Sequence, residues 1–332
     1  DFLFDRKQCV VINSSKSSWS TVTSGIPQGS VLGPTLFLIY INDIEDSIES
    51  AIRLFADDTK LFAPVISDSD VAKIQLDTNK LSLWSEKWLL KFNIQKCCTL
   101  HYGRNNPHHT YYLEEGSIRH EISNKLCERD LGITFDTNLK FRQHINDCIN
   151  KANRMTGFVR RSFLHITTRN FRKLYKSIIR PHLEYGNIIW SPRFKMDIDA
   201  LERVQRRATK LVYYVRNFSY FDRLRLLKIP SLSYRRFRGD MIQVYKLINN
   251  KEDLSYELFF KKSQHQITRG HSLKLDIPSC RKDIRKYFFS NRVISDWNAL
   301  PENIISAPSL NTFKNRLDDF MDDMKYTVHP EN

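Results

Sequence analysis

The chain has 332 residues, of which 41% are hydrophobic, so it holds enough apolar material for two or three folded domains. Its six cysteines are scattered and no secretory signal precedes them, which argues against a disulfide-stapled extracellular protein. No hydrophobic run is long enough to span a membrane, and the formal net charge is +15. We therefore expect an intracellular protein that is neither secreted nor bound to a membrane.

A stretch rich in glycine and proline, SGIPQGSVLGP, is the first informative segment in chain order. Pro27 and Gly29 indicate a sharply turned loop, and Gly29 allows a ligand to approach the backbone because it has no side chain. Pro34 suits the first turn of a helix, where a missing N–H costs nothing. The residues that follow, through Tyr40, are nearly all apolar, so we expect this helix to be buried.

Two adjacent aspartates, Asp57 and Asp58, interrupt the apolar segment AIRLFADDTKLF. The flanking residues indicate two short strands joined by a tight turn, which places both carboxylates at the tip of a β-hairpin. Adjacent carboxylates repel each other, so they are stable either in open water or around a divalent cation. This segment alone is compatible with a solvated acidic turn and with a metal-binding tip.

The order and spacing of these two motifs, SGIPQGSVLGPTLFLIYINDI and LFADDTKLF, resemble the nucleotide pocket and catalytic hairpin of reverse transcriptases from LINE-class non-LTR retrotransposons. The next palm motif of that family resembles WSEKWLLKFNIQKC, and its primer-grip region resembles RDLGITFDTNLKF. The thumb and C-terminal region of the Jockey-like branch resemble later segments such as IIRPHLEYGNIIWSP and FFSNRVISDWNALP. The resemblance covers almost the whole chain.

The resemblance implies an RNA-directed DNA polymerase, in which a primer 3′-hydroxyl attacks the α-phosphate of an incoming deoxynucleotide. The implied cofactor is a pair of Mg²⁺ ions, which can activate the attacking oxygen and stabilise the leaving pyrophosphate. The implied partners are an RNA template, a DNA primer, the RNA–DNA hybrid and deoxynucleoside triphosphates. The implied locations are a cytoplasmic ribonucleoprotein and the nucleus.

The resemblance also assigns roles to single residues. Asp57 and Asp58 would hold the metal ions, with Asp57 as the principal ligand. Lys96 would protonate the leaving pyrophosphate, although an ordinary surface lysine is the alternative. The loop that would contact the nucleotide and the template base comprises Pro27, Gln28, Gly29 and Ser30. Leu131 and Gly132 would form the centre of a short hairpin that grips the primer.

One part of the family pattern is missing from this chain. The family takes a further metal-binding aspartate from an earlier palm strand, and neither Asp1 nor Asp5 stands in that pattern. The fingers, the first palm strand and an N-terminal endonuclease domain are expected to be absent as well. We therefore expect the chain alone to be inactive, either as the C-terminal part of a larger polyprotein or as a decayed element.

The positive charge is confined to the second half of the chain. Residues 1–150 carry 16 Lys and Arg against 19 Asp and Glu, whereas residues 151–332 carry 36 against 18. An excess of this size over a whole region favours a polyanionic partner. Without sequence-reading motifs, we expect contacts to the nucleic-acid backbone, with an affinity that falls steeply as salt rises.

Helical periodicity predicts where this charge lies. We expect one helix over 144–161 and another over 197–212. Between them, Thr168 can cap a helix that Pro181 breaks or kinks. The exposed cations proposed to contact phosphates are Lys151, Arg154, Arg160, Arg203, Arg206, Arg207 and Lys210. A solvated helix exterior is the alternative. Arg235, Arg236 and Arg238 add another basic cluster.

Three further expectations concern packing. A helix over about 70–91 should place Trp84 and Trp88 in the core, because aromatic residues on such a stripe are more often core than stacking platforms. Helical signals weaken between 251 and 280 and return at 288–297. After Pro308 a last helix should direct Phe313 and Leu317 inward.

The predicted fold class is α+β. A partial right-hand polymerase palm, a β-hairpin with packed helices, would occupy 1–138, a helical thumb or connection region 139–250, and a C-terminal helical region 251–332. Zinc binding at Cys97, Cys98 and His101 is disfavoured because paired CxxC spacing is missing, and Ser30 stands in no nucleophile-elbow pattern. The alternative function is a non-catalytic nucleic-acid-binding remnant of a decayed retroelement. A group II intron or telomerase enzyme fits the C-terminal motifs poorly.

Overall fold

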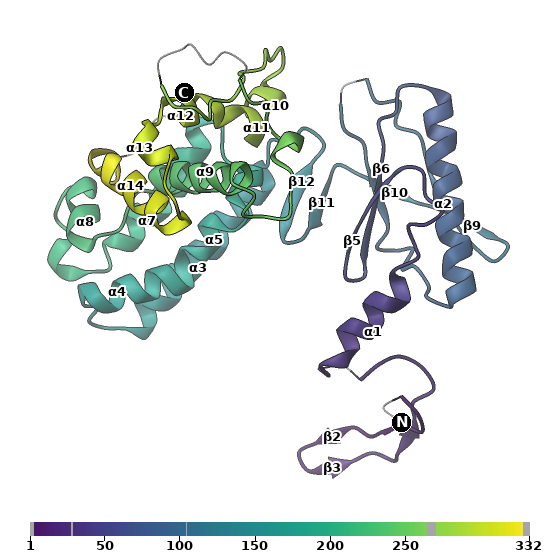
Figure 1. The fold of residues 1–332 in the computed structure, drawn as a ribbon. Helices are drawn as coiled ribbons and strands as arrows, with labels where there is room; N and C mark the ends of the chain where they lie inside the picture. The colour runs from purple at the N-terminus through teal and green to yellow at the C-terminus, as the bar shows by residue number, and fades with distance from the viewer. Residues whose placement is uncertain (1–2, 28, 104, 264–269, 328–332) are drawn as a thin grey trace. The chain divides into compact units, whose positions relative to one another are not determined.

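The structure, a computed structural model, describes residues 3–27, 29–103, 105–263 and 270–327. It mixes helices with short strands (Figure 1) and divides into two compact units, Asp1–Leu126 and Cys127–Asn332. The division falls ahead of residue 138, because the hairpin that follows Leu126 packs on the helices of the second unit. No helix in the described part of the chain is both long and apolar enough to cross a bilayer.

The first unit contains two helices and five pairs of short strands among its described residues. The helices are α1 (Leu32–Ile41) and α2 (Asp68–Trp88). The antiparallel pairs are β1 (Lys7–Gln8) with β4 (Ser20–Thr21), β2 (Val11–Ile12) with β3 (Ser15–Lys16), β5 (Ala51–Phe55) with β6 (Asp58–Phe62), and β8 (Tyr112–Glu115) with β9 (Ile118–Glu121). The parallel pair is β7 (Cys98–Leu100) with β10 (Ser123–Lys125).

The amphipathic helix α2 organises the first unit. A capping box between Ser67 and Asp70 starts the helix, and Leu81 is buried in a core with Ile41, Ile44 and Ile52. Trp84 packs against this core, as predicted, whereas Trp88, for which the same was predicted, is half-buried and is not part of it. The indole nitrogen of Trp84 also donates to Asp43 Oδ1 at 2.8 Å, which joins α2 to the segment after α1.

Helix α1 is less buried than the sequence predicts. Val31 is 92% exposed and Ile39 is 69% exposed, and Leu32, Leu38 and Tyr40 are also open to solvent. Only Gly33 and Ile41 are buried. The expectation of a buried helix was wrong for this chain, because the described residues of the first unit cover only the C-terminal turn of α1.

The second unit is mainly helical. It opens with the hairpin of β11 (Cys127–Asp130) and β12 (Ile133–Asp136). Its helices are α3 (Arg142–Ser162), α4 (Thr168–Leu174), α5 (Pro181–Glu184), α6 (Asn187–Trp190), α7 (Lys195–Thr209), α8 (Tyr220–Leu227), α9 (Leu232–Ile248), α10 (Asp283–Lys286), α11 (Phe289–Arg292), α12 (Ile294–Ala299), α13 (Glu302–Ile305) and α14 (Leu310–Phe320). The π-helical turn is η1 (Tyr175–Ile179), and the 3₁₀ turns are η2 (Tyr213–Val215), η3 (Tyr256–Leu258) and η4 (Asp322–Met324).

Two cores hold this unit together. In the first, α3 and α7 pack against each other through the apolar stripes that the sequence predicts, including Ala152, Val159 and Leu201. In the second, α9 packs against α12 and α14, and the fully buried ring of Phe313 stacks on Tyr245 with centroids 4.3 Å apart. Leu317 is also fully buried, so the inward positions predicted after Pro308 are confirmed.

Between α4 and α5 the chain forms the π-helical turn η1. The hydrogen bond from Arg180 N to Tyr175 O, at 2.8 Å, spans five residues, and Pro181 then begins α5 without an N–H to donate. At the predicted break or kink, the helix therefore widens locally into a π-helical turn before Pro181. The N-cap of α4 is Thr167, whose side chain accepts from Asn170 N, and not Thr168 as expected.

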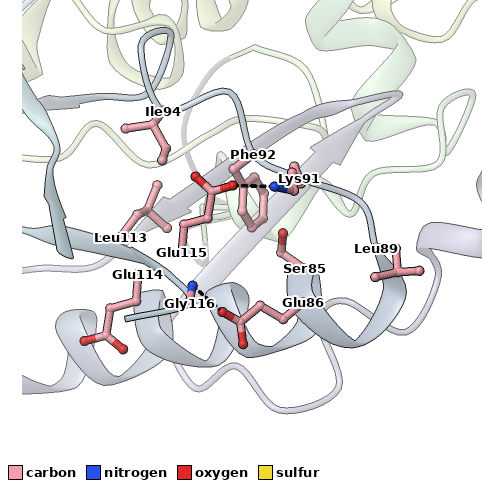
Figure 2. Close-up of a pocket in the computed structure, with 10 residues that line it drawn as sticks. All are labelled: Ser85, Glu86, Leu89, Lys91, Phe92, Ile94, Leu113, Glu114, Glu115 and Gly116. Carbon is pink, nitrogen blue, oxygen red and sulfur yellow. Dashed lines mark hydrogen bonds and ion pairs between the residues drawn. The ribbon is translucent and has the colours of Figure 1, made fainter. Parts of the chain in front are cut away.

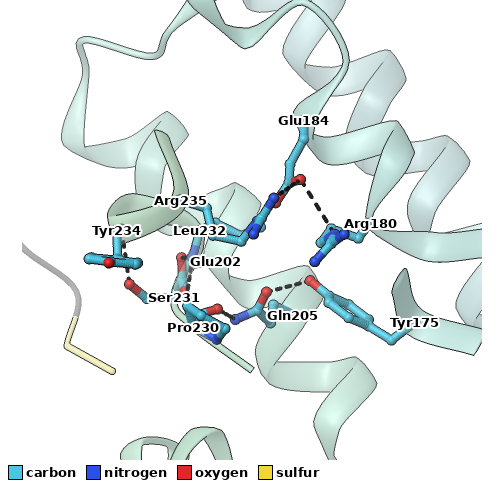
Figure 3. A network of polar contacts seen from close by, with 10 residues as sticks. All are labelled: Tyr175, Arg180, Glu184, Glu202, Gln205, Pro230, Ser231, Leu232, Tyr234 and Arg235. Carbon is cyan, nitrogen blue, oxygen red and sulfur yellow. Dashed lines mark hydrogen bonds and ion pairs between the residues drawn. The ribbon is translucent and has the colours of Figure 1, made fainter. Parts of the chain in front are cut away.

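A buried polar network links α7 to η1 and to the loop before α9 (Figure 3). Glu202 is almost fully buried, accepts a hydrogen bond from Tyr220, and accepts one from Leu232 N at 3.1 Å. Gln205 accepts from Tyr175 and donates to Pro230 O at 2.9 Å. Burial raises the pKa of the Glu202 carboxyl, despite the hydrogen bond from Tyr220 that opposes this shift.

The arginines of α9 take part in internal contacts instead of forming an open basic cluster. Arg235 forms an ion pair with Glu184, and Arg238 Nη2 donates to Asp318 Oδ2 at 2.9 Å (Figure 3 shows the first pair). Arg236 is only 3% exposed. Arg235 and Arg238 are thus paired with acidic residues that lie far away in the sequence.

Candidate catalytic hairpin and nucleic-acid interface

The acidic pair lies at the tip of a hairpin, as predicted. The strands β5 and β6 pair in the register Phe55 opposite Asp58, which leaves Ala56 and Asp57 as a two-residue turn. Ala56 adopts a φ of +51°, a conformation that favours glycine. Both aspartates are exposed, while Ile52 on β5 is buried in the core. The hairpin thus presents two carboxylates on an anchored support.

The buried carboxylate of Asp77 on α2 fixes the start of this hairpin. It accepts hydrogen bonds from Ser50 N at 2.8 Å and from Glu49 N at 3.2 Å, and Lys80 Nζ lies 3.1 Å away. Burial alone would raise the pKa of Asp77, but the hydrogen bonds from Ser50 and Glu49 outweigh it and lower the pKa. Nothing in the sequence pattern of α2 indicated this role.

The two carboxylates can supply part of a metal site. Carboxylate oxygens are the ligands that Mg²⁺ prefers, and this ion commonly uses one or two protein carboxylates together with water and substrate phosphates. Within the described ranges, no group of three or more His, Cys, Asp or Glu side chains is placed to hold a metal ion. Asp57 and Asp58 would therefore supply only part of the ligands of a metal site, and water and substrate phosphates would supply others.

The loop before α1 is braced by Ser30. Its hydroxyl donates to Pro27 O at 2.8 Å and accepts from Gly33 N at 3.0 Å. Gly29 has a φ of +77°, and a Cβ at this position would meet nothing within 4 Å, so the backbone is open on that side. Gln28 lies outside the described residues. The expected supporting geometry of Ser30 is present, while the contacts to nucleotide and template stay a prediction.

Lys96 lies in the turn before β7, and its side chain is exposed. Its backbone N–H donates to Asn93 O at 2.9 Å, so the turn is ordered by its own backbone. This position is compatible with a lysine that reaches a substrate and with an ordinary surface lysine. The proposed acid role is therefore still a prediction.

A pocket of about 220 Å³ lies beside α2 in the first unit (Figure 2). Its apolar wall includes Leu89, Phe92 and Leu113, and its rim carries the exposed ion pair of Lys91 with Glu115. None of the site residues predicted from the sequence lines this pocket. Its volume is below the range usual for small-molecule sites, so the pocket is not the candidate site.

The candidate primer-grip hairpin belongs to the second unit. Leu131 and Gly132 form its two-residue turn with φ values of +43° and +86°, as a type I′ turn requires. Tyr185, which sequence analysis did not single out, donates to Leu131 O at 2.9 Å. His144 on α3 accepts from Thr134 N at 3.2 Å through Nδ1, which anchors β12 to α3.

His144 is buried, and its ring packs edge to face against that of Trp190, with the ring centroids 5.2 Å apart. Burial lowers the pKa of His144, and the neighbouring Asp147 opposes this shift only in part. A neutral ring is also what the hydrogen bond requires, because Nδ1 must be free of a proton to accept from Thr134. The hairpin is therefore held by a neutral histidine.

Helices α3 and α7 bring the predicted backbone-binding cations onto one packed pair. Arg207 Nη1 on α7 donates to Asn153 Oδ1 on α3 at 2.9 Å. Asn153 is the residue before Arg154, so this bond joins the two cation-bearing helices. Arg154, Arg160, Arg203, Arg206, Arg207 and Lys210 are exposed, and Lys151 is half-buried. Arg203 and Arg206 also border a shallow hollow of about 450 Å³ together with Asp199 and Glu202. The placement of these cations outside the core is as predicted.

Comparison with known proteins identifies the first part of the chain. Residues 1–142 match the family model described as reverse transcriptase (RNA-dependent DNA polymerase). The chain carries a reverse transcriptase domain. The matched range includes the loop at Pro27, the acidic hairpin tip at Asp57 and the turn at Gly132.

Curated relatives extend this similarity into the helical unit. The RNA-directed DNA polymerase from mobile element jockey of Drosophila melanogaster is 31% identical over 262 residues, which cover 73% of this chain and 27% of that protein. The probable RNA-directed DNA polymerase from transposon X-element of the same species is 27% identical over 248 residues, 69% of this chain and 26% of that protein. The corresponding protein from transposon BS is 28% identical over 236 residues, with shares of 65% and 25%.

The resemblance to non-LTR retrotransposon proteins is thus confirmed. The chain spans about a quarter of the length of these curated relatives. No solved structure gives a significant match.

Proposed function

We propose that this reverse transcriptase domain belongs to an RNA-directed DNA polymerase that extends a DNA primer on an RNA template with deoxynucleoside triphosphates. The observation that carries the proposal is the exposed carboxylate pair at the tip of an anchored hairpin, within the range that matches the reverse transcriptase family. A rigid support suits this chemistry, because nucleotidyl transfer depends on positioning and charge neutralisation more than on covalent catalysis.

Asp57 and Asp58 would each contribute oxygen ligands to the Mg²⁺ ions. When bound, such ions would stabilise the negative charge on the attacking and leaving oxygens of the displacement. The open backbone at Gly29 would let the nucleotide approach, and Ser30 would hold the loop in shape. Lys96 would deliver a proton to the leaving pyrophosphate.

We expect the 332 residues alone to show no primer extension. Two carboxylates are fewer than a two-metal site requires, and the described residues place no third acidic ligand with them. A metal-binding test on the chain itself is therefore the first experiment. Ferrous ion, added in place of Mg²⁺ with ascorbate and peroxide, generates radicals that cut the backbone near the bound metal.

Cleavage should fall around residues 56–58 and should be lost in the variant Asp57→Asn with Asp58→Asn. The matched control is Asp46→Asn, which changes an exposed aspartate of the same unit. The metal assignment would be refuted if the parent chain were not cut at the hairpin tip. It would also be refuted if the double variant were cut there as strongly as the parent. Next, a polymerase that joins this chain to an upstream segment with the third aspartate should lose extension on Asp57→Ala.

A second candidate function is nucleic-acid binding without catalysis. The exposed cations of α3 and α7 favour it, because they do not depend on a complete metal site. Primer extension that is unaffected by Asp57→Ala, together with strong binding to RNA, would support this second function over the first.

A further inference from the structure

The turn η2, between α7 and α8, directs two tyrosines outward. In a 3₁₀ turn, residues three apart share a face, and Val212 and Val215 are both buried. The two residues between them, Tyr213 and Tyr214, are consequently 68% and 80% exposed. The burial of Val212 and Val215 thus directs Tyr213 and Tyr214 to solvent.

The segment is held to the helical unit by Arg223 of α8, which is 3% exposed. Its guanidinium donates to Thr209 Oγ1 at 3.0 Å and to Phe218 O at 2.6 Å. A third bond, to Arg206 O at 3.3 Å, reaches the last turn of α7. One side chain therefore ties both ends of the loop together, so the tyrosines sit on a preorganised support.

The two rings form an ordered pair. Their centroids are 6.2 Å apart with an interplanar angle of 83°, which is an edge-to-face arrangement. The guanidinium of Arg216 lies 4.4 Å from the ring centroid of Tyr213, within the range of a cation–π contact. Tyr214 keeps most of its surface open.

The surroundings are strongly positive. Residues 203–228 contain eight Lys and Arg and a single acidic residue, Asp222. Of these cations only Arg223 is buried, and Arg207 and Lys210 lie six and three residues before Tyr213. Exposed aromatic rings among cations are the combination with which proteins bind single-stranded nucleic acids, the rings stacking on bases and the cations following the backbone.

We propose that Tyr213 and Tyr214 form a base-stacking site for single-stranded nucleic acid, next to the cations at the end of α7. The proposal rests on the nucleic-acid binding that belongs to the proposed function, and it adds a site that contacts bases and not phosphates. Stacking on an aromatic side chain contributes roughly a factor of five to 150 in affinity for each base. The site should therefore prefer single strands to duplexes, in which the bases are already stacked.

The test uses the full chain and labelled oligouridylate, oligothymidylate and an abasic oligonucleotide of equal length. The variant Tyr213→Leu with Tyr214→Leu keeps apolar side chains but removes the rings. We expect it to bind the two base-containing strands about tenfold more weakly and the abasic strand as tightly as the parent. The salt dependence of binding should not change, because no phosphate contact is removed.

Phe288→Leu is the matched control, since this ring is 48% exposed and has Arg285 at 5.5 Å on another part of the unit. It should leave all three affinities unchanged. A double tyrosine variant that binds every strand like the parent, or that loses equal affinity for the abasic strand, would overturn the stacking site. A parent chain whose binding is insensitive to salt would instead contradict the phosphate contacts of the proposed function, so the two failures are distinct.

Discussion

Tyr185 donates its phenolic hydrogen to the carbonyl oxygen of Leu131 at 2.9 Å, and its ring lies against the next residue of the same turn. A Cβ built on Gly132 would come within 3.1 Å of Tyr185 Cε1. The candidate primer-grip turn is thus shaped by a residue more than fifty positions later in the chain. Tyr185 therefore restricts the turn of this hairpin, while His144 anchors its second strand.

The first prediction concerns Gly132→Ala. We expect a loss of about 1–3 kcal/mol in the free energy of unfolding, because a φ of +86° is unfavourable for alanine and the added methyl group meets Tyr185. Urea unfolding of the variant measures this loss. In a Tyr185→Ala background the steric part should disappear while the backbone part stays. An equal loss in both backgrounds would show that Tyr185 does not restrict the turn.

Leu131→Asn should have the opposite effect on stability. Leu131 holds a φ of +43°, which a leucine rarely adopts, and Asn-Gly is a favoured pair for a type I′ turn. We expect a gain of about 0.5–1 kcal/mol in unfolding free energy. If the leucine contacts the primer, an active polymerase that carries this change should extend primers less well despite its greater stability. Unchanged extension would remove Leu131 from the primer grip.

The stability of the second unit should depend on pH through His144. Burial lowers the pKa of His144 below its ordinary value of 6.5, so the unfolded chain binds a proton more readily than the folded chain. Unfolding free energy should therefore fall as pH decreases below about 6.5 and recover above it. Urea midpoints measured between pH 5 and 8 test this prediction.

The variant His144→Gln tests the role of this histidine. Its control is His165→Gln, which changes an exposed histidine. The first substitution should make the slope below about pH 6.5 shallower, because it removes one titrating ring. His271 of the same unit, whose pKa is also lowered by burial, should keep part of the slope. The second substitution should leave the slope as it is. A slope that is the same with and without His144 would mean that other groups control the acid sensitivity of this unit.

Asp77→Ala should destabilise the first unit by about 2–4 kcal/mol. The change leaves the N–H groups of Glu49 and Ser50 without their acceptor at the start of β5. Unfolding followed by tryptophan fluorescence measures the loss, since Trp84 lies in the same unit. Asp46→Asn is the control, with an expected change within about 0.5 kcal/mol. Metal-dependent cleavage at Asp57 should become diffuse in the Asp77 variant, because the hairpin is no longer fixed at its base.

Removal of the cations on α7 should weaken RNA binding in a manner that depends on salt. The variant combines Arg203→Gln, Arg206→Gln, Arg207→Gln and Lys210→Gln. The slope of log affinity against log salt should become shallower by roughly 0.7 for each phosphate contact that is lost. The control combines Arg281→Gln with Lys282→Gln, two exposed cations elsewhere in the unit. Equal slopes for the parent and the α7 variant would place the phosphate contacts on another surface.

Local sequence signals were sufficient for several features of the fold. The apolar runs around Asp57, the turn at Leu131 and Gly132, and the helical stripes of α3 and α7 were predicted because the residues that determine each element lie within it. The assignment of Trp84 to the core followed from the same periodicity. The reverse transcriptase resemblance was confirmed independently over residues 1–142.

Features that depend on distant partners were not predictable in this way. From the sequence alone, Arg238 would be expected to lie on the surface like most arginines. Its partner Asp318 is 80 residues away in the sequence and is brought to it only by the fold. Tyr185 and His144 act on a hairpin to which no sequence pattern connects them. The prediction that α1 is buried was wrong for a related reason. The apolar sequence of a helix indicates that it packs against another surface, but it does not indicate which part of the protein supplies that surface.

The uncovered side of α1 also has a practical consequence for work with this protein. Val31, at the N-terminus of α1, and Leu38 and Ile39 within it are exposed apolar side chains on one short helix. Concentrated preparations of these 332 residues should self-associate through these side chains, and mild detergent or replacement of Ile39 by lysine should keep them monodisperse.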